Sequence, residues 1–249
     1  MPRKFGQHFL IRDAVLERLA RATCNEHSDR VIEIGPGRGA LTQHLLPRTD
    51  ELHAVEIDRA LVHYLGTKFA GETKLTLHQA DVLATDLSQW GSAVVAGNLP
   101  YYITSPIVEK FVRLDSRFPR AVFLTQWEVA ERLLANPGSR DFGYLTVATR
   151  LVCDVELVCK VPPEAFVPPP KVESGALLLR RKAKSVERLE PLLHFVSACF
   201  RQKRKTLRNN LRGIYRDAIE QQPEASLRAE QLSIAQFQDL FARLYTGDS

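Results

Sequence analysis

The chain has 249 residues, of which 45% are hydrophobic and 25% charged, and this composition is typical of a globular protein with a buried core. It excludes a disordered, collagen-like or coiled-coil protein, and the length allows one or two domains. The formal net charge is +5 and is unevenly distributed, because residues 176–249 carry 14 basic and 8 acidic side chains whereas residues 1–175 carry 20 and 21.

Hydrophobic runs in the first half of the chain alternate with stretches long enough for crossover helices. Asp13 is a candidate N-cap for a first helix. Five strand-like runs follow, at residues 30–35, 51–57, 74–79, 92–97 and 120–126. Ser105 followed by Pro106 predicts a helix start just after the fourth run. This alternation predicts an α/β fold in which a mostly parallel sheet has helices on both faces.

The second half of the chain has a different pattern. It begins with a predicted helix and a predicted strand pair, at residues 143–152, 154–161 and 174–180. Between the two strands lies a proline-rich segment, PPEAFVPPPKVE, in which we expect no regular structure. From about Lys182 onward the pattern is helical. We therefore predict two domains, residues 1–182 and a small all-helical domain at residues 183–249.

Three glycines, Gly35, Gly37 and Gly39, lie between a strand-like run and a predicted helix. Such glycines let the backbone turn tightly and let a nucleotide-like ligand approach bare amides. Gly35-x-Gly37-x-x-Ala40 also satisfies the dinucleotide fingerprint, so a dehydrogenase is an alternative. Glu33 favours a different ligand, because a carboxylate beside this turn would repel a pyrophosphate but suits the cationic sulfonium and amino groups of S-adenosylmethionine.

Two further acids follow predicted strands. Glu56 ends the second strand, where its two oxygens can accept hydrogen bonds from both hydroxyls of a ribose. Asp81 follows the third strand, where it can accept from the exocyclic amine of an adenine. Because ligands of open α/β sheets bind at the carboxyl ends of the strands, we expect both acids to face the same ligand as the glycine turn.

The segment GNLPYY, residues 97–102, follows the fourth strand and suits the methylation of a planar amine. The lone pair of an adenine amine is delocalised into the ring, so an enzyme must hold both N–H groups to direct this nitrogen. Asn98 offers a side-chain carbonyl, the rigid unit of Leu99 and Pro100 offers a backbone carbonyl, and Tyr101 offers a ring on which an extracted base can stack. Catalysis here would rest mainly on positioning and electrostatics.

The cations of the C-terminal region gather in two segments, residues 180–184 and 200–216, which together hold eleven basic residues and no acid. Such a patch suits nucleic acid, and it is also compatible with a solvated helix face.

The four cysteines, Cys24, Cys153, Cys159 and Cys199, do not have the spacing of a zinc or redox motif. We expect reduced thiols, no bound metal ion and a cytoplasmic protein. No run approaches the roughly 18 apolar residues that a membrane span requires, so we expect no membrane partner.

With these motifs in order, the sequence resembles the ribosomal RNA adenine dimethyltransferases, and most closely the bacterial enzymes that act on the small subunit. Seven motifs carry the resemblance nearly from end to end: FGQHFL (5–10), EIGPGRGALT (33–42), VEID (55–58), QADVL (79–83), NLPYYI (98–103), FVPPPKVES (166–174) and FRQKRKTLRNNL (200–211).

The resemblance implies a Rossmann-like class I methyltransferase domain with a small helical C-terminal domain. It implies S-adenosylmethionine as the methyl donor and, as substrate, two adjacent adenines near the 3′ end of small-subunit (16S) ribosomal RNA in an immature 30S particle. The product would be N6,N6-dimethyladenosine, formed during small-subunit biogenesis. We expect the protein to act as a monomer.

The resemblance also assigns residues by position. Contacts to the cofactor would come from His8, Leu10, Gly35, Glu56, Asp81 and Asn98. The target-adenine pocket would be formed by Asn98, Leu99, Pro100 and Tyr101, with Phe166 closing on the base from the proline-rich segment. The RNA backbone would be held by Lys171, Arg201, Lys203, Arg204, Lys205 and Arg208.

The sequence departs from the family pattern at one of these positions. The family's N-terminal element usually reads Gln-Asn-Phe, whereas this chain has Gln7-His8-Phe9. An imidazole can replace the amide as a donor or as an acceptor but not as both at once.

Other functions stay open. One is methylation of large-subunit ribosomal RNA, of DNA adenine or of a protein glutamine, since Asn-Pro-Pro-Tyr loops serve planar amines and amides generally. Leu99 in place of a proline, together with the basic C-terminal region, makes the DNA and protein substrates less favoured. Another is a ribosome-assembly or transcription factor that binds without turnover.

Overall fold

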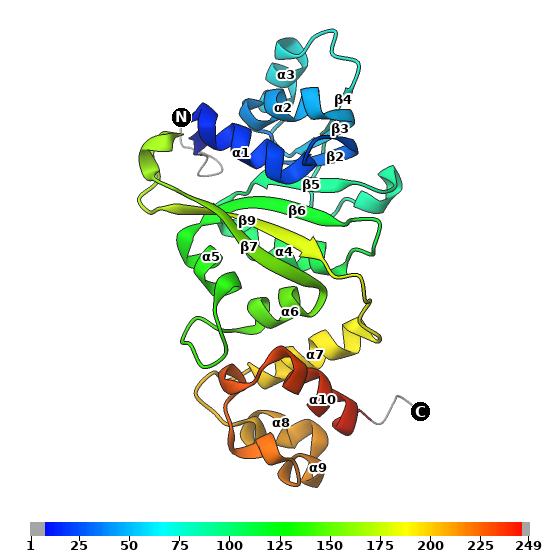
Figure 1. The fold of residues 1–249 in the computed structure, drawn as a ribbon, viewed down its shortest axis with the longest axis vertical. Coiled ribbons are helices and arrows are strands. Elements are labelled where there is room, and N and C mark those ends of the chain that lie inside the picture. Colours follow the sequence, from blue (N-terminus) through cyan, green and yellow to red (C-terminus); the bar gives the residue numbers. More distant parts are fainter. Residues whose placement is uncertain (1–7, 246–249) are drawn as a thin grey trace. The chain divides into compact units, whose positions relative to one another are not determined.

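The computed structural model describes residues 8–245, and a seven-stranded sheet is its largest element (Figure 1). The strand order is β4-β3-β2-β5-β6-β9-β7. The strands are β2 (Ser28–Ile34), β3 (Thr49–Glu56), β4 (Leu75–Gln79), β5 (Val94–Asn98), β6 (Arg120–Gln126), β7 (Cys153–Val161) and β9 (Ser174–Arg181). The first five are parallel and β9 is antiparallel to β6. The predicted α/β class with a mostly parallel sheet is confirmed.

Helices cover both faces of this sheet. Helices α1 (Asp13–Cys24) and α2 (Ala40–Leu45) share a hydrophobic core with one face, where Leu19 and Leu45 pack with Val122. Helix α4 (Thr104–Arg113) lies on the other face, where the rings of Phe111 and Phe123 meet edge to face at 5.9 Å. Because neighbouring residues of a strand point to opposite faces, Val122 and Phe123 serve two different layers. Helix α3 (Arg59–Lys68) follows β3, and α5 (Trp127–Leu134) follows β6.

The predicted strands correspond to observed strands whose ends differ by at most two residues. The expected N-cap at Asp13 is wrong, because Arg12 holds the N-cap position and its side chain makes no capping hydrogen bond. Asp13 lies instead in the first turn of α1, where a carboxylate still interacts favourably with the helix dipole.

The proline-rich segment contains regular structure that the sequence did not predict. Strand β8 (Phe166–Val167) pairs with β1 (Phe9–Leu10) in a two-stranded antiparallel sheet, and the amide of Ile11 donates to the carbonyl of Ala165 at 2.8 Å. The expectation failed because the three consecutive prolines begin only at residue 168, so Phe166 and Val167 retain the N–H groups that a strand pair needs.

The chain divides into two compact units, which we describe separately. Unit 1 comprises residues 1–130 and 154–183, and unit 2 comprises residues 131–153 and 184–249. Unit 2 is helical, with α6 (Tyr144–Val152), α7 (Leu189–Cys199), α8 (Leu207–Tyr215), α9 (Asp217–Glu220) and α10 (Ile234–Leu244). Residues 131–153 group with the C-terminal helices because α6 packs on α7 and α10. The domain boundary at 182/183 stays a prediction. The grouping into units differs from it mainly because residues 131–153, which include α6, belong to unit 2.

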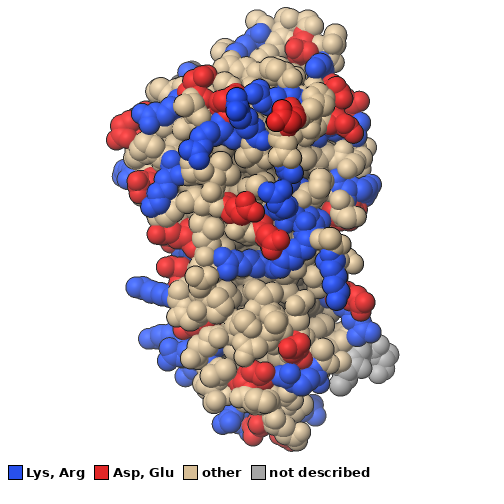
Figure 2. Space-filling model, in the orientation of Figure 1, with Lys and Arg blue, Asp and Glu red and all other residues tan. Residues whose placement is uncertain are grey.

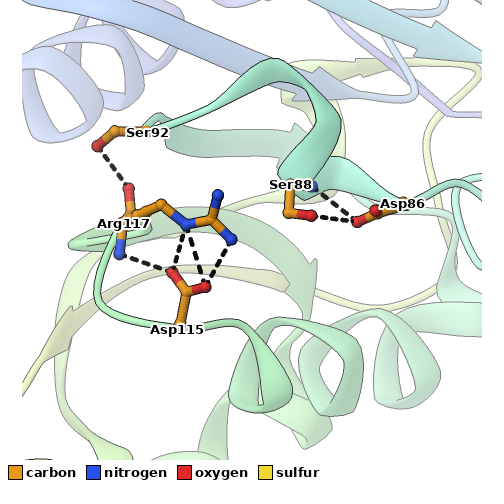
Figure 3. Close-up of polar contacts among 5 residues, drawn as sticks. All are labelled: Asp86, Ser88, Ser92, Asp115 and Arg117. Carbon is orange, nitrogen blue, oxygen red and sulfur yellow. Dashed lines mark hydrogen bonds and ion pairs between the residues drawn. The ribbon is translucent and has the colours of Figure 1, made fainter.

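Polar contacts join the segments just before β5 and β6, at the amino ends of these parallel strands (Figure 3). Arg117 donates from Nη2 to Asp115 Oδ2 at 2.7 Å, and its carbonyl accepts from Ser92 Oγ at 2.7 Å. The Asp86 side chain accepts from the amide and hydroxyl of Ser88 at 2.9 and 2.7 Å. These bonds lower the pKa of Asp86 and of Asp115, so both acids stay ionised and fix the turns before the two strands.

Candidate active site

A cavity of about 450 Å³ opens at the carboxyl ends of β2, β3 and β5. Its lining comes from the glycine turn after β2, from Glu56 and Ile57 at the end of β3, and from residues 98–102 after β5. The N-terminal strand contributes residues 8–11, and α1, α2, α3 and β8 complete the wall. The sheet therefore has its cavity where open α/β sheets bind ligands.

The glycine turn needs glycine for both conformation and space. Gly35, Gly37 and Gly39 have positive φ angles of 65°, 59° and 74°. A Cβ atom on Gly37 would lie 3.1 Å from the ring of Phe9, and one on Gly39 would lie 2.5 Å from the ring of Phe69. Since L-residues rarely adopt this backbone conformation and the neighbouring rings leave no room, the turn keeps its amides bare.

Two buried carboxylates face the cavity. Glu33 is 1% exposed and accepts a hydrogen bond from Thr42 Oγ1 at 2.6 Å. Burial raises the pKa of Glu33 to about 7, although the Thr42 bond opposes this and the Glu56 charge adds to it. Glu56 is 5% exposed, and its oxygens accept from the amides of Gly37 at 3.2 Å and Asp58 at 3.0 Å. Burial also raises the pKa of Glu56. Two acids in one apolar setting favour a ligand that brings positive charge.

The loop after β5 presents oriented polar groups. Asn98 Nδ2 donates to the carbonyl of His8 at 3.1 Å, which leaves its Oδ1 as an acceptor. The carbonyl of Pro100 already accepts from the amide of Ile103 at 3.1 Å and from Thr104 Oγ1 at 3.2 Å. The amide of Leu99 donates to the carbonyl of Leu124 in β6 at 2.9 Å, which ties the loop to the sheet. Of the two backbone carbonyls of Leu99 and Pro100, the carbonyl of Leu99 is therefore the available acceptor.

Tyr101 is held from two sides. Its hydroxyl hydrogen-bonds Ser174 Oγ at 2.9 Å, and its ring stacks with that of His8 at a centroid distance of 5.6 Å and an interplanar angle of 24°. Burial raises the pKa of Tyr101, so the phenol stays neutral. A neutral ring fixed at both ends is suited to stacking against a planar group.

Of the other predicted cofactor residues, Leu10 and Gly35 line the cavity, whereas Asp81 is absent from its lining. Asp81 is exposed after β4, and its Oδ1 accepts from the amide of Leu83 at 2.8 Å. The cofactor roles of these residues stay predictions. The residues Phe5 to Gln7 of the N-terminal motif lie outside the described part of the chain.

The predicted role of Phe166, closing on the target base, stays a prediction, and its side chain lies outside the cavity lining. This side chain is 2% exposed and belongs to the core that β8 shares with Leu10, so it does not face the cavity in this conformation. The reason is the alternation of a strand, which turns Phe166 inward and Val167 outward. Val167, 50% exposed, lines the cavity in its place.

Sequence analysis missed many residues of the lining. Ile57, Tyr64 and Lys68 all contribute to it, and Lys68 Nζ donates to the carbonyl of Arg38 in the glycine turn at 2.9 Å. Ile57 could have been found as the residue that follows Glu56. Tyr64 and Lys68 belong to α3, where no motif points to a ligand.

The predicted RNA-binding cations of unit 2 occupy the turn between α7 and α8 and the start of α8. Arg201, Lys203, Arg204, Lys205 and Arg208 are exposed. The turn is anchored by buried Asn210, whose Nδ2 donates to the carbonyls of Cys199 at 2.7 Å and Gln202 at 3.2 Å. Lys203 also donates to the carbonyl of Arg140.

Lys171, the predicted RNA contact of unit 1, is exposed in the proline-rich segment. On the face drawn in Figure 2, cations and carboxylates are interspersed, which is consistent with a local rather than a general excess of positive charge.

Residues 8–245 contain neither a metal-binding cluster nor a membrane-spanning helix. This part of the chain contains no cluster of three or more His, Cys, Asp or Glu side chains that could hold a metal ion. None of its helices has both the length and the apolar character of a membrane span.

Comparison with known proteins gives one consistent family. The family model described as ribosomal RNA adenine dimethylase matches residues 1–245. Ribosomal RNA small subunit methyltransferase A of Nitrosomonas europaea is 41% identical over 254 residues, covering 98% of this chain and 97% of that protein. The protein of the same name from Thiobacillus denitrificans is 39% identical over 98% of each chain.

Two solved structures share the fold over nearly the whole chain. A dimethyladenosine transferase from Plasmodium falciparum has a TM-score of 0.82 at 27% identity, covering 94% of this chain and 96% of its own. The 23S rRNA methyltransferase ErmE has a TM-score of 0.69 at 30% identity, covering 95% and 99%.

Proposed function

Because the chain belongs to the ribosomal RNA adenine dimethylase family, we propose that it is an S-adenosylmethionine-dependent enzyme that methylates N6 of two adjacent adenines near the 3′ end of small-subunit ribosomal RNA. The product is N6,N6-dimethyladenosine, and the substrate is an immature 30S particle. In this proposal the protein acts as a monomer in the cytoplasm.

The residues of the cavity fit the donor. Glu33 suits a cationic amino group, and Glu56 retains free lone pairs for ribose hydroxyls after accepting two amide hydrogen bonds. The turn at Gly37 has no side chain that covers its amides, so a ligand can approach them closely, and a Cβ there would lie only 3.1 Å from the ring of Phe9. When bound, the donor supplies an electrophilic methyl group on a cationic sulfur.

One observation carries the proposal: the hydrogen bond from Asn98 Nδ2 to the His8 carbonyl fixes the amide so that Oδ1 is the acceptor. Asn98 Oδ1 and the carbonyl of Leu99 accept the two N–H groups of a target adenine. Both bonds favour a tetrahedral nitrogen whose lone pair is no longer shared with the ring. Tyr101 holds the base by stacking, and the alkylated amine releases its proton to water without a basic side chain.

Unit 2 supplies the second part of recognition. The exposed cations of the turn between α7 and α8, together with Lys171 in unit 1, hold the phosphate backbone. Such contacts carry no base specificity, so the choice of adenine rests on the pocket around Asn98.

The experiment uses purified protein, labelled S-adenosylmethionine and immature 30S particles from cells that lack the enzyme. We expect label in dimethyladenosine near the 3′ end of the small-subunit RNA, found by nuclease digestion and mass spectrometry. Labelled donor bound without transfer would support the non-catalytic assembly factor instead.

Large-subunit RNA is a second candidate substrate, because the 23S rRNA methyltransferase ErmE is 30% identical over 95% of this chain. Supplying immature 50S particles in a parallel reaction separates the two. Methylation of the large-subunit RNA alone would replace the small-subunit proposal.

A further inference from the structure

One buried side chain organises the basic turn of unit 2, residues 200–206 between α7 and α8. Asn210, in the first turn of α8, is 6% exposed, whereas the adjacent Asn209 is exposed. Asn210 Nδ2 donates to the carbonyls of Cys199 at 2.7 Å and Gln202 at 3.2 Å, and its Oδ1 accepts from the amide of Gln202 at 3.2 Å. All three hydrogen bonds therefore go to the backbone at the start of the turn.

These bonds reach the backbone where the helix no longer supports it. Cys199 is the last residue of α7, so its carbonyl is one of those that a helix leaves without an internal partner. Gln202 lies at the centre of the cationic run, and its carbonyl also accepts from the amide of Lys205 at 2.9 Å. Asn210 thus sets the path of the chain from the end of α7 to Lys205.

The rest of the basic turn is held by contacts within unit 2. The amide of Leu207 donates to the carbonyl of Leu227 at 2.8 Å, which fixes the start of α8. Lys203 Nζ donates to the carbonyl of Arg140. The turn is therefore restrained at both ends, and Asn210 is the side chain that restrains its first half.

The basic turn needs this support because its cations repel one another. They lie between residues 201 and 208, at the N-terminal end of α8, where the helix dipole is also unfavourable to positive charge. The first turn of α8 contains no acidic residue that would offset them. The cations involved are Arg201, Lys203, Arg204, Lys205 and Arg208.

We propose that Asn210 is a positioning residue for RNA binding, which holds the basic turn in the one conformation that presents its cations to the phosphate backbone. Because Asn210 is buried, it acts through the backbone of the turn and does not touch the RNA. A turn that is already ordered loses less conformational freedom on binding, so more of its interaction energy appears as affinity. The inference rests on the proposed function only for the identity of the RNA.

Two pairs of substitutions isolate the hydrogen bonds of Asn210. Asn210→Ala removes all three without changing the charge, and its matched control is Asn209→Ala, the same exchange at the adjacent exposed position. Asn210→Asp keeps the acceptor for the Gln202 amide but loses the donor to both carbonyls. Its control, Asn209→Asp, adds the same negative charge beside the turn.

The first measurement is the dissociation constant for small-subunit ribosomal RNA between 50 and 200 mM salt. We expect Asn210→Ala to raise it about 10-fold and to lower the slope of log affinity against log salt by about 1, while Asn209→Ala stays within about 2-fold of the wild type. Asn210→Asp should likewise bind more weakly than Asn209→Asp. Equal effects within either pair would overturn the inference.

Steady-state methyl transfer to immature 30S particles separates positioning from a general loss of structure. In Asn210→Ala the KM for the particles should rise, while kcat and the affinity for S-adenosylmethionine stay within about 2-fold of the wild type, because the pocket around Asn98 is unchanged. A fall in kcat with an unchanged KM would contradict a role in RNA binding.

Hydrogen exchange followed by mass spectrometry tests the turn in the protein alone. Residues 200–206 should exchange faster in Asn210→Ala than in the wild type or in Asn209→Ala, since the amide of Gln202 loses its acceptor, and α10 should keep its wild-type exchange. Unchanged exchange in the turn, or an equal increase in α10, would refute a specific role in positioning. If the wild type forms no dimethyladenosine but RNA affinity and exchange respond as expected, the proposed function fails while the role of Asn210 stands.

Discussion

The side-chain amide of Asn98 donates to the backbone carbonyl of His8, with 3.1 Å between the nitrogen and the oxygen, across 90 positions of sequence. A carbonyl cannot donate, so the bond decides which end of the amide faces the pocket. The N-terminal strand therefore orients the acceptor on which the proposed chemistry depends.

Replacing Asn98 tests this orientation. Asn98→Ala removes the acceptor, and Asn98→Asp places a carboxylate against the His8 carbonyl, so both should lower kcat by about 10²-fold or more. The dissociation constant for RNA should change by less than about 3-fold, because phosphate contacts elsewhere dominate affinity. Asn136→Ala, at an exposed position of unit 2, serves as the control. Equal losses in kcat and RNA affinity would mean that Asn98 is only a binding contact.

Glu33 should give stability a distinctive pH dependence. Its pKa is about 7 in the folded protein against an ordinary value of 4.5, so the native state holds an extra proton between these values. The contribution of Glu33 to the free energy of unfolding is present below pH 4.5 and is lost as pH rises through 7. Glu33→Gln lacks this loss, so the stability of the variant relative to the wild type should increase between pH 5 and pH 8, by about 3 kcal/mol at most.

Urea unfolding of both proteins at pH 5, 6, 7 and 8 provides the measurement for Glu33. If the difference in the free energy of unfolding between the two proteins does not change with pH over this range, Glu33 is not a buried, protonated carboxyl. The variant should also bind S-adenosylmethionine more weakly at pH 8, where it lacks the negative charge.

The rings of His53 in β3, His78 in β4 and Trp90 in the 3-10 helix Leu87–Trp90 form a cluster. His53 stacks with both other rings, and His53 Nδ1 lies 3.0 Å from His78 Nε2. Burial lowers the pKa of both histidines, and the Arg30 charge lowers that of His53 further, against the opposing effect of Glu51. Both rings are therefore neutral in the native state, and their contribution to stability is present above pH 6.5 and is lost as pH falls below it.

His78→Gln should remove part of this acid sensitivity. Urea unfolding at pH 5.0 and 7.5, followed by Trp90 fluorescence in a Trp127→Phe background, should show a smaller loss on acidification in the variant than in the parent. A loss of the same size in both proteins would mean that the histidine pair does not control this response.

The basic turn of unit 2 should govern the salt dependence of RNA binding. Replacing Lys203, Arg204 and Lys205 by Ala removes up to three phosphate contacts, which should lower the slope of log affinity against log salt by about 2. Donor affinity should be unchanged. Measuring the dissociation constant for small-subunit RNA between 50 and 200 mM salt checks this, and an unaltered slope would assign the RNA contacts to another surface.

Much of the fold could be predicted because local sequence carries it. The alternation of strand-like runs with helical stretches located all seven strands of the large sheet, since periodicity is a property of neighbouring residues. The glycine turn was equally predictable, because positive φ angles at Gly35, Gly37 and Gly39 are a local demand. The motif from Asn98 to Tyr101 likewise identified the segment after β5 as a candidate part of the site.

The tertiary structure alone decided how these pieces meet. The pairing of β1 with β8, the burial of Phe166 and the bond between Tyr101 and Ser174 each join segments that are distant in the chain. Tyr64 and Lys68 reach the cavity only because α3 packs beside the glycine turn. A local pattern specifies which residues can form a strand or a turn, whereas the partner of each side chain depends on which surfaces the packed core brings within hydrogen-bonding distance.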